Sequence, residues 1–123
     1  MAFIPYKNNR GAAVSFKYMP CDDITVTLGE ALKVSSGHLV ACGTTDKPEY
    51  IAMESKTITT DGNPLYVLIV EPTTEFETAV VASVTTIGAR YKLDSYATGV
   101  QNDTTSGVAE LLEVQPDRLV VRF

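Results

Sequence analysis

Residues 28–39 read LGEALKVSSGHL, and a similar pattern returns 59 positions later (from Leu28 to Ile87), where residues 87–95 read IGARYKLDS and Gly99-Val100 follow. Each copy places an apolar residue and a glycine before a short alternating strand. A polar turn with a glycine then leads into a second strand, which is typical of a β-hairpin. The two copies predict an all-β chain, and they suggest that it contains two related β-turn-β units.

The rest of the chain also favours strands. Its 123 residues are 45% hydrophobic, threonine, valine and tyrosine are plentiful, and long stretches of helix formers are missing. About ten short strands, separated by Gly, Pro and Asp turns, predict a small β-barrel or sandwich formed by residues 13–123 as a single β domain. The continuous apolar run 65–70 (LYVLIV) predicts a strand buried on both faces.

Two further stretches bear on the sheet. Residues 76–84 (FETAVVASV) fit a strand or a short helix, and their β-branched residues favour the strand. The closing residues 119–123 (LVVRF) predict a strand that is paired in the sheet, because so apolar a terminus is normally covered.

Residues 1–12 (MAFIPYKNNRGA) predict an extended arm outside the core. Pro5 favours extended geometry in the residue before it, Asn8, Asn9 and Gly11 are turn formers, and no helical period is present. The arm nevertheless carries large apolar residues. Two alternatives fit this combination: an arm that binds a partner, and a terminus that is disordered or packs on its own chain.

Charge and hydropathy disfavour two classes of partner. Residues 1–20 hold three basic residues and no acidic one, a net charge of +3, whereas the rest of the chain carries 7 basic and 15 acidic residues, a net charge of −8. An acidic body repels phosphate, so we expect no nucleic-acid partner. The longest apolar run is far shorter than a membrane span and no signal-peptide pattern opens the chain, so we expect a soluble protein made in a cytoplasm, with no membrane partner.

The residues that carry chemistry do not form a known motif. Cys21 and Cys42 predict two reduced thiols, with a single bridge between neighbouring strands as the alternative. His38 is the one histidine, and Cys42, four positions on, would lie about 13 Å away along a strand, too far for a nucleophile and its base. Asp22-Asp23 and Asn102-Asp103 lack calcium-loop spacing. We therefore expect no enzyme, no metal and no cofactor.

Short phrases along the chain carry a resemblance to a known family. They are MAFIP at 1–5, NRGAA at 9–13, LGEAL at 28–32, SGHL at 36–39, KPEYIAM at 47–53, GVAE at 107–110 and VVRF at 120–123. On these phrases the chain resembles the capsid decoration, or cement, proteins of tailed bacteriophages. The resemblance covers most of the chain in pattern and includes no catalytic motif.

The resemblance implies a structural virion protein. Such proteins are β-rich and commonly trimeric, and they sit on the outside of the phage head, where they clamp neighbouring major capsid subunits. It implies synthesis in the bacterial host cytoplasm, the major capsid protein as partner and a homotrimer on the capsid. Because an N-terminal arm often docks on the lattice in such proteins, we expect the contact in Phe3, Ile4, Pro5, Tyr6, Lys7 and Arg10.

Three alternatives stay open. A small carbohydrate- or ligand-binding module would use the loops 35–37, 43–47 and 94–99 as a rim around Tyr50, Tyr91 or Tyr96, and it should show an aromatic-lined concavity. An enzyme would use Glu71, Glu75 and Glu77 and should show converging carboxylates. Another phage head or tail subunit would share the small β fold. A decoration protein should instead show a flat apolar patch and a mobile arm.

Overall fold

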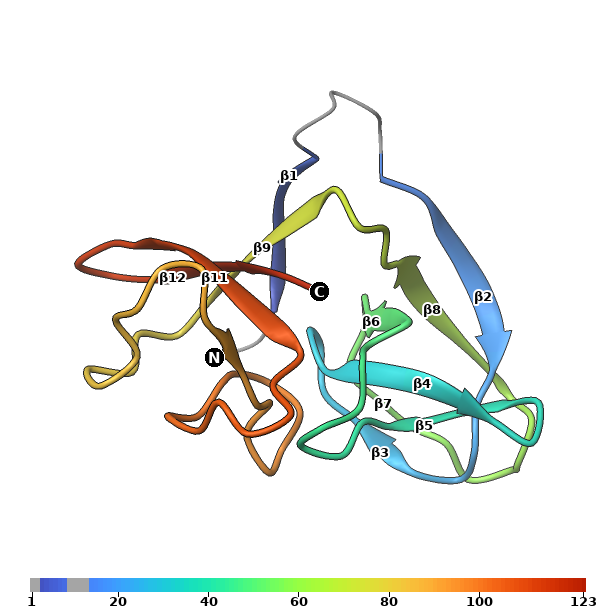
Figure 1. Ribbon diagram of the computed structural model, residues 1–123. Coiled ribbons are helices and arrows are strands. Elements are labelled where there is room, and N and C mark those ends of the chain that lie inside the picture. The colour runs from blue at the N-terminus through green and yellow to red at the C-terminus, as the bar shows by residue number, and fades with distance from the viewer. Residues whose placement is uncertain (1–2, 9–13) are drawn as a thin grey trace.

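The computed structural model describes residues 3–8 and 14–123 and confirms the all-β prediction (Figure 1). Strands make up 43% of the structure, and no helix is present in these ranges. The strands are β1 (Ile4–Asn8), β2 (Phe16–Pro20), β3 (Thr25–Val26), β4 (Ala31–Ser35), β5 (His38–Ala41), β6 (Tyr50–Ala52), β7 (Lys56–Thr57), β8 (Pro64–Ile69), β9 (Thr74–Thr78), β10 (Arg90–Tyr91), β11 (Ala109–Val114) and β12 (Leu119–Arg122).

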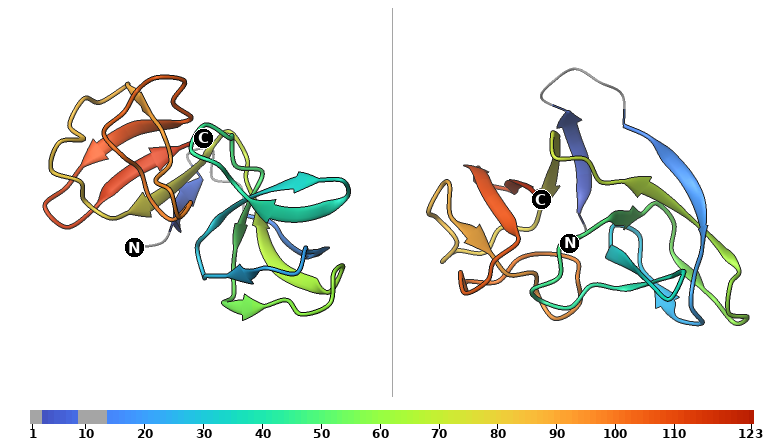
Figure 2. Two further views of the ribbon diagram at one scale, coloured as in Figure 1. Left: turned by 90° about the horizontal axis from the view of Figure 1, so that it is seen from below. Right: turned by 45° about the vertical axis from the view of Figure 1, so that its right-hand side comes forward.

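The strands form two larger antiparallel sheets and one small one. Sheet A has the order β1-β9-β12-β11-β10, sheet B has the order β2-β8-β6-β4-β5, and β3 pairs with β7. Figure 2 shows sheets A and B side by side, with the segment from β8 to β9 passing between them. Among the described strands neither sheet closes into a barrel, although one parallel bridge joins Cys21, after β2, to Leu39 of β5. The barrel alternative is therefore not formed.

Strand pairing in the two sheets follows one plan. In sheet B, Ala31 of β4 pairs with Ile51 of β6. In sheet A, Arg90 of β10 pairs with Glu110 of β11, and each of these two residues lies 59 positions after its counterpart in sheet B. An antiparallel register is set residue by residue, so the same offset on both strands is unexpected for unrelated hairpins.

The turn before each pair repeats as well. The N–H of Gly29 donates to the Ala52 carbonyl at 2.7 Å, and the N–H of Gly88 donates to the Leu111 carbonyl at 2.8 Å, again 59 positions apart. Both glycines adopt positive φ, 84° and 90°, which a residue with a side chain rarely adopts. These contacts repeat between the two predicted units and so support the hypothesis that the units are related.

The repeat extends to four strands of each sheet. Lys17 of β2 pairs with Val67 of β8, and Phe76 of β9 pairs with Val121 of β12, with offsets of 59 (17 to 76) and 54 (67 to 121). The order β2-β8-β6-β4 in sheet B therefore matches β9-β12-β11-β10 in sheet A. The two sheets differ at one edge: β1 lies on the outer side of β9, whereas β2 is itself the edge of sheet B (Figure 1).

Strand β8 of sheet B has buried residues on both of its faces. Leu68 of β8 belongs to a core shared with sheet A, and Leu65 and Val67 of the same strand belong to a second core on the opposite face. This arrangement confirms the prediction for the run 65–70, because β8 lies inside the sheet between β2 and β6. The predicted pairing of the closing strand is also confirmed, since β12 lies between β9 and β11.

The described part of the predicted arm differs from the expectation of an extended segment outside the core. Phe3 is fully buried, with its ring edge-on to Phe123 at a centroid distance of 5.1 Å, and β1 pairs antiparallel with β9. Burying an aromatic ring and pairing the backbone both stabilise this position. The described part of 1–12 thus belongs to sheet A, and residues 1–2 and 9–12 lie outside the described ranges.

The strand interpretation of 76–84 is confirmed as far as Thr78, where β9 ends, and no helix forms in that stretch.

Cys21 and Cys42 are both free and buried, as expected for reduced thiols. Burial raises the pKa of Cys42 to about 12, so its thiol stays protonated and unreactive.

Candidate functional site

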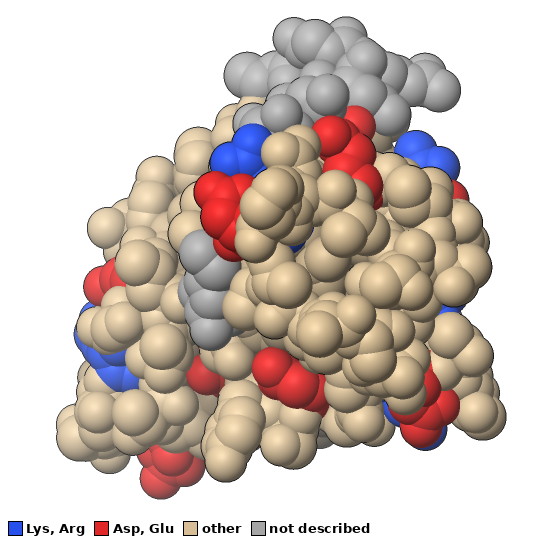
Figure 3. All heavy atoms as spheres, turned by 90° about the vertical axis from the view of Figure 1, so that its left-hand side faces the viewer, with Lys and Arg blue, Asp and Glu red and all other residues tan. Residues whose placement is uncertain are grey.

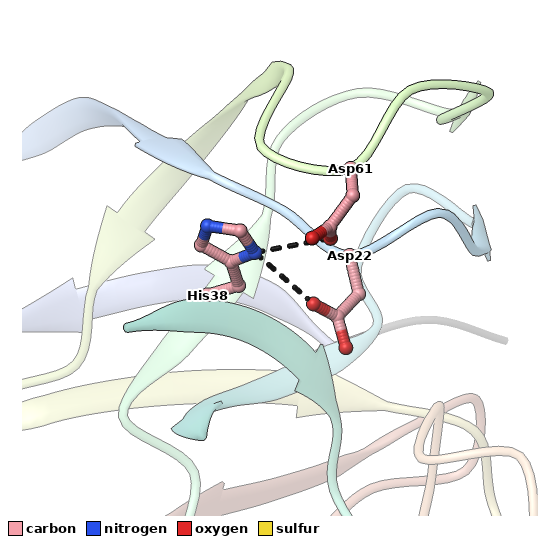
Figure 4. Close-up of side chains that lie close together, drawn as sticks. All are labelled: Asp22, His38 and Asp61. Atoms are coloured by element: carbon pink, nitrogen blue, oxygen red, sulfur yellow. Dashed lines mark hydrogen bonds and ion pairs between the residues drawn. The ribbon is translucent and has the colours of Figure 1, made fainter. Parts of the chain in front are cut away.

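Asp22, His38 and Asp61 come together from three separate segments (Figure 4). Asp22 follows β2, His38 opens β5, and Asp61 lies in the turn between β7 and β8. Backbone hydrogen bonds hold these segments against one another: the Asp22 N–H donates to the Leu39 carbonyl at 3.1 Å, and the Gly62 N–H donates to the Cys21 carbonyl at 2.8 Å. The cluster therefore lies where the two edges of sheet B meet.

The imidazole of His38 points at both carboxylates. Its Nδ1 lies 3.2 Å from Asp22 Oδ1 and 3.0 Å from Asp61 Oδ1. The side chains are 31%, 40% and 60% exposed for His38, Asp22 and Asp61, so the cluster is open to solvent on one side. The hydrogen bond to Asp61, followed by the contact with Asp22, raises the pKa of His38.

Sequence reasoning considered Asp22 and His38 separately and missed Asp61. No linear motif joins the three residues, because the backbone contacts near Cys21 and Leu39 bring them together only when sheet B folds. Carboxylate oxygens and an imidazole nitrogen can bind a cation, accept or donate a proton, or form an ion pair. The site is therefore a candidate for ion binding.

A second candidate site is an aromatic surface on the edge of sheet B. Phe16 and Tyr18 of β2 flank Tyr66 of β8, with ring centroids 5.7 Å and 4.9 Å from that of Tyr66. Phe16 is 43% exposed and Tyr18 is 66% exposed. We call these three residues the aromatic edge. The alternating pattern of Phe16 and Tyr18 was its signal in the sequence, since side chains two apart share a face of a strand.

The six predicted arm residues have different surroundings. Phe3 is in the core, which corrects its expected place on an exposed docking surface. Ile4 is 45% exposed and Pro5 is half-buried opposite Phe76. The backbone of Tyr6 and Lys7 forms part of β1, with Lys7 opposite Glu75. Arg10 lies outside the described residues.

The three carboxylates of the enzyme alternative, Glu71, Glu75 and Glu77, have different surroundings. Glu77 of β9 forms an ion pair with Arg118, with Oε1 and Nε 3.5 Å apart. Glu75 of the same strand is buried, and Glu71 lies at the rim of a pocket between β8 and β9. Of these three carboxylates, Glu71 alone lines that pocket.

A shallow pocket of about 580 Å³ lies where the two sheets meet. Tyr50 and Phe123 supply its aromatic walls, and Lys47, Glu49 and Glu71 supply charged groups. The pocket brings together Lys47 and Tyr50 of the predicted ligand rim. The other rim aromatics lie apart: Tyr91 is buried, and Tyr96 is 79% exposed.

Asp46 stabilises the loop 43–47, which is one of the three loops of the predicted ligand rim. Its Oδ2 accepts a hydrogen bond from the Gly43 N–H at 2.7 Å and lies 2.8 Å from Lys33 Nζ. The hydrogen bond from Lys33, and then that from Gly43, lower the pKa of Asp46 from its ordinary 3.8. The ionised carboxylate is therefore stabilised in the folded state.

Asp46→Asn is expected to lower the free energy of unfolding at pH 7 by less than about 1 kcal/mol, because the ion pair is exposed. The folded-state pKa is below the unfolded one, so the contribution is complete above pH 3.8 and is lost as pH falls through the lower folded value. Urea denaturation at pH 7 and at about pH 2.5 measures the difference between the two proteins. A gap that stays constant with pH contradicts this origin, and Asp23→Asn is the charge-matched control.

In residues 3–8 and 14–123, no helix has the length and hydropathy needed to cross a bilayer. Acidic and basic side chains are interspersed on the side of the molecule drawn in Figure 3, and cross-strand pairs such as Arg122 with Glu110, 3.1 Å apart, join opposite charges.

No protein-family model matches the chain, and no curated protein matches it either.

Proposed function

We propose that this chain is a structural protein of a tailed-phage head, which binds the outside of the capsid and stabilises the lattice of the major capsid protein without catalysing a reaction. Its place is the capsid exterior, where we propose a homotrimer. The resemblance in short sequence phrases supports this proposal. The observation that carries it is the edge of sheet B along β2, which pairs only with β8 among the described strands, since the bridge to β5 lies beyond the strand at Cys21. The equivalent edge of sheet A, at β9, holds an added strand, β1.

The internal repeat defines how a strand would add to sheet B. On β9, Ile4 of β1 lies opposite Glu77 and Asn8 lies opposite Thr74. An offset of 59 positions carries Glu77 and Thr74 to Tyr18 and Ser15. A strand docked like β1 would thus pair along residues 15–18, with main-chain hydrogen bonds supplying the pairing. The aromatic edge would supply the apolar contact.

We propose that the added strand is an extended apolar segment of the major capsid protein. The β1 of a second copy is a poorer occupant, because moving it would expose Phe3, whose burial is worth about 1.5–3 kcal/mol. The outer side of β1 is a poor continuation of the sheet as well, since Pro5 has no N–H to donate.

The arm keeps a part in the proposal. Ile4 is exposed at the edge of sheet A and is available to a neighbouring capsid subunit. For Pro5, Tyr6, Lys7 and Arg10 the proposed contact rests on the resemblance, and basic residues suit an acidic partner surface. Three copies in a trimer would present three such surfaces, and simultaneous binding multiplies a modest affinity.

The double variant Phe16→Ser/Tyr18→Ser is expected to weaken attachment to heads at least tenfold. Exposed aromatic residues that become buried in an interface contribute about 2 kcal/mol or more each, and 1.4 kcal/mol corresponds to a factor of ten. Co-sedimentation with expanded heads of the phage that encodes the chain measures the attachment. Tyr96→Ser removes an even more exposed aromatic residue elsewhere and should bind like the parent protein. Full occupancy by a folded double variant would refute the role of this edge.

The pocket favours a second candidate function, the binding of a small carbohydrate or similar ligand. Tyr50 offers a ring on which a sugar could stack, and Lys47 and Glu49 offer hydrogen bonds at the same pocket. Heteronuclear NMR of the purified protein, titrated with mono- and disaccharides, tests it. Saturable shifts around Tyr50 would favour this function over a purely structural one.

A further inference from the structure

We propose that Asp22, His38 and Asp61 form a binding site for a divalent transition-metal ion such as Zn²⁺. The three side chains offer one nitrogen and two oxygens, and these atoms all lie within 4.8 Å of one another (Figure 4). This site is separate from the aromatic edge and from the pocket, so the proposal stands independently of the proposed function.

The distances from the imidazole nitrogen to the two carboxylate oxygens match those between ligands of one ion. Bonds of about 2.1 Å from a metal to nitrogen or oxygen place neighbouring ligand atoms about 3.0 Å apart at octahedral angles and about 3.4 Å apart at tetrahedral angles. Nδ1 of His38 lies 3.2 Å from Asp22 Oδ1 and 3.0 Å from Asp61 Oδ1. An ion could therefore enter among the three atoms with small side-chain shifts.

The hydrogen bonding and charge of the cluster favour a cation. A single Nδ1–H faces two carboxylate oxygens, so one proton is shared between two acceptors that each favour a full hydrogen bond. With a neutral imidazole the cluster carries a charge of −2. A divalent ion replaces the shared proton, neutralises both carboxylates and contacts all three ligands at once.

The segments that carry the ligands are already in place. The backbone bonds from Asp22 to Leu39 and from Gly62 to Cys21 fix two of them. Gly62 lies against the imidazole, where a Cβ atom would be 3.6 Å from Cε1 of His38. A site whose ligands are held by the fold loses less entropy when the ion binds.

The donor set selects the kind of ion. One imidazole and two carboxylates suit Zn²⁺, Co²⁺ or Ni²⁺, with water completing the coordination on the exposed side. Calcium prefers six to eight oxygen ligands, which these three residues do not offer. A bound ion would join the end of β2, the start of β5 and the turn after β7, at the place where one bridge links the edges of sheet B.

The test uses the full chain with ZnCl₂ at pH 7.5 in isothermal titration calorimetry, with thermal unfolding in parallel. We expect saturable binding of one ion per chain and a melting temperature that rises with zinc concentration, because an ion that binds only the folded state stabilises it. His38→Gln and Asp61→Asn should each weaken binding at least tenfold. Asp23→Asn removes an exposed neighbouring acid outside the cluster and should bind like the parent protein.

An NMR titration with zinc and with calcium tests whether the ion binds at His38. The Hε1 proton resonance of His38, the single histidine, should shift or broaden on titration with zinc, and CaCl₂ should leave it unchanged at the same concentrations. Equal zinc affinity in the His38→Gln variant would overturn the proposal. It would also be overturned by a parent protein that binds no zinc below about 1 mM, and the cluster would then be an ion pair only.

Discussion

Replacing Phe76 with alanine is expected to lower the free energy of unfolding by about 3–5 kcal/mol. The ring is fully buried and lies 5.3 Å, centroid to centroid, from that of Phe123. It belongs to the core shared by both sheets, and its strand pairs with β1 on one side and β12 on the other. Since a domain of this size is stable by about 5–15 kcal/mol, the variant should lose a large part of its stability.

Urea denaturation followed by far-UV circular dichroism measures this effect. Phe16→Ala removes a ring of the same size that is 43% exposed, and its cost should stay below about 1 kcal/mol. A similar loss in the two variants would mean that the core shared by the sheets contributes little. Phe76→Leu fills most of the space and should fall between the two.

The second large effect is expected for Gly107→Ala. A Cβ atom at this position would overlap the backbone carbonyl group of Arg90 and lie 2.8 Å from the Tyr91 nitrogen. Backbone atoms of β10 cannot move aside as a flexible side chain can, so β10 would have to separate from β11. We expect a loss of about 3 kcal/mol or more, comparable to other severe backbone and packing defects.

Gly37→Ala provides the matched control, because Gly37 has positive φ but no atom within 4 Å of the added Cβ. Its cost should be that of a strained backbone alone, about 1–2 kcal/mol. Thermal melts of both variants and the parent protein measure the difference. Equal melting temperatures for the two variants would contradict a steric origin at Gly107.

Local patterns were enough to predict the all-β class, although β1 was expected to lie outside the sheet and β7 was not predicted. The duplicated hairpin was visible because glycines with positive φ and alternating strands leave a direct trace in the residues, as at Gly29 and Gly88. The buried strand β8 was visible because both of its faces are apolar. Whether a sheet closes into a barrel depends instead on the register and tilt of all its strands. These local patterns therefore could not predict whether the sheets would be open or closed.

Long-range contacts were the part that could not be predicted. The apolar side chain of Phe3 indicated that it would be buried against something. Hydropathy does not show whether that surface belongs to a partner or to the protein's own Phe123. In the same way, Asp61 joins Asp22 and His38 only through backbone bonds between segments far apart in the chain. Both cases depend on tertiary contacts, and single-sequence patterns report mainly local ones.

The two buried thiols have a practical consequence. Cys21 is fully inaccessible and Cys42 is 5% exposed, and burial raises the pKa of both. Alkylating dyes require an accessible thiolate. A cysteine engineered at an exposed position can therefore carry a fluorophore or spin label on the otherwise unaltered chain, and distances between copies on a surface can be measured without first removing the native sulfur atoms.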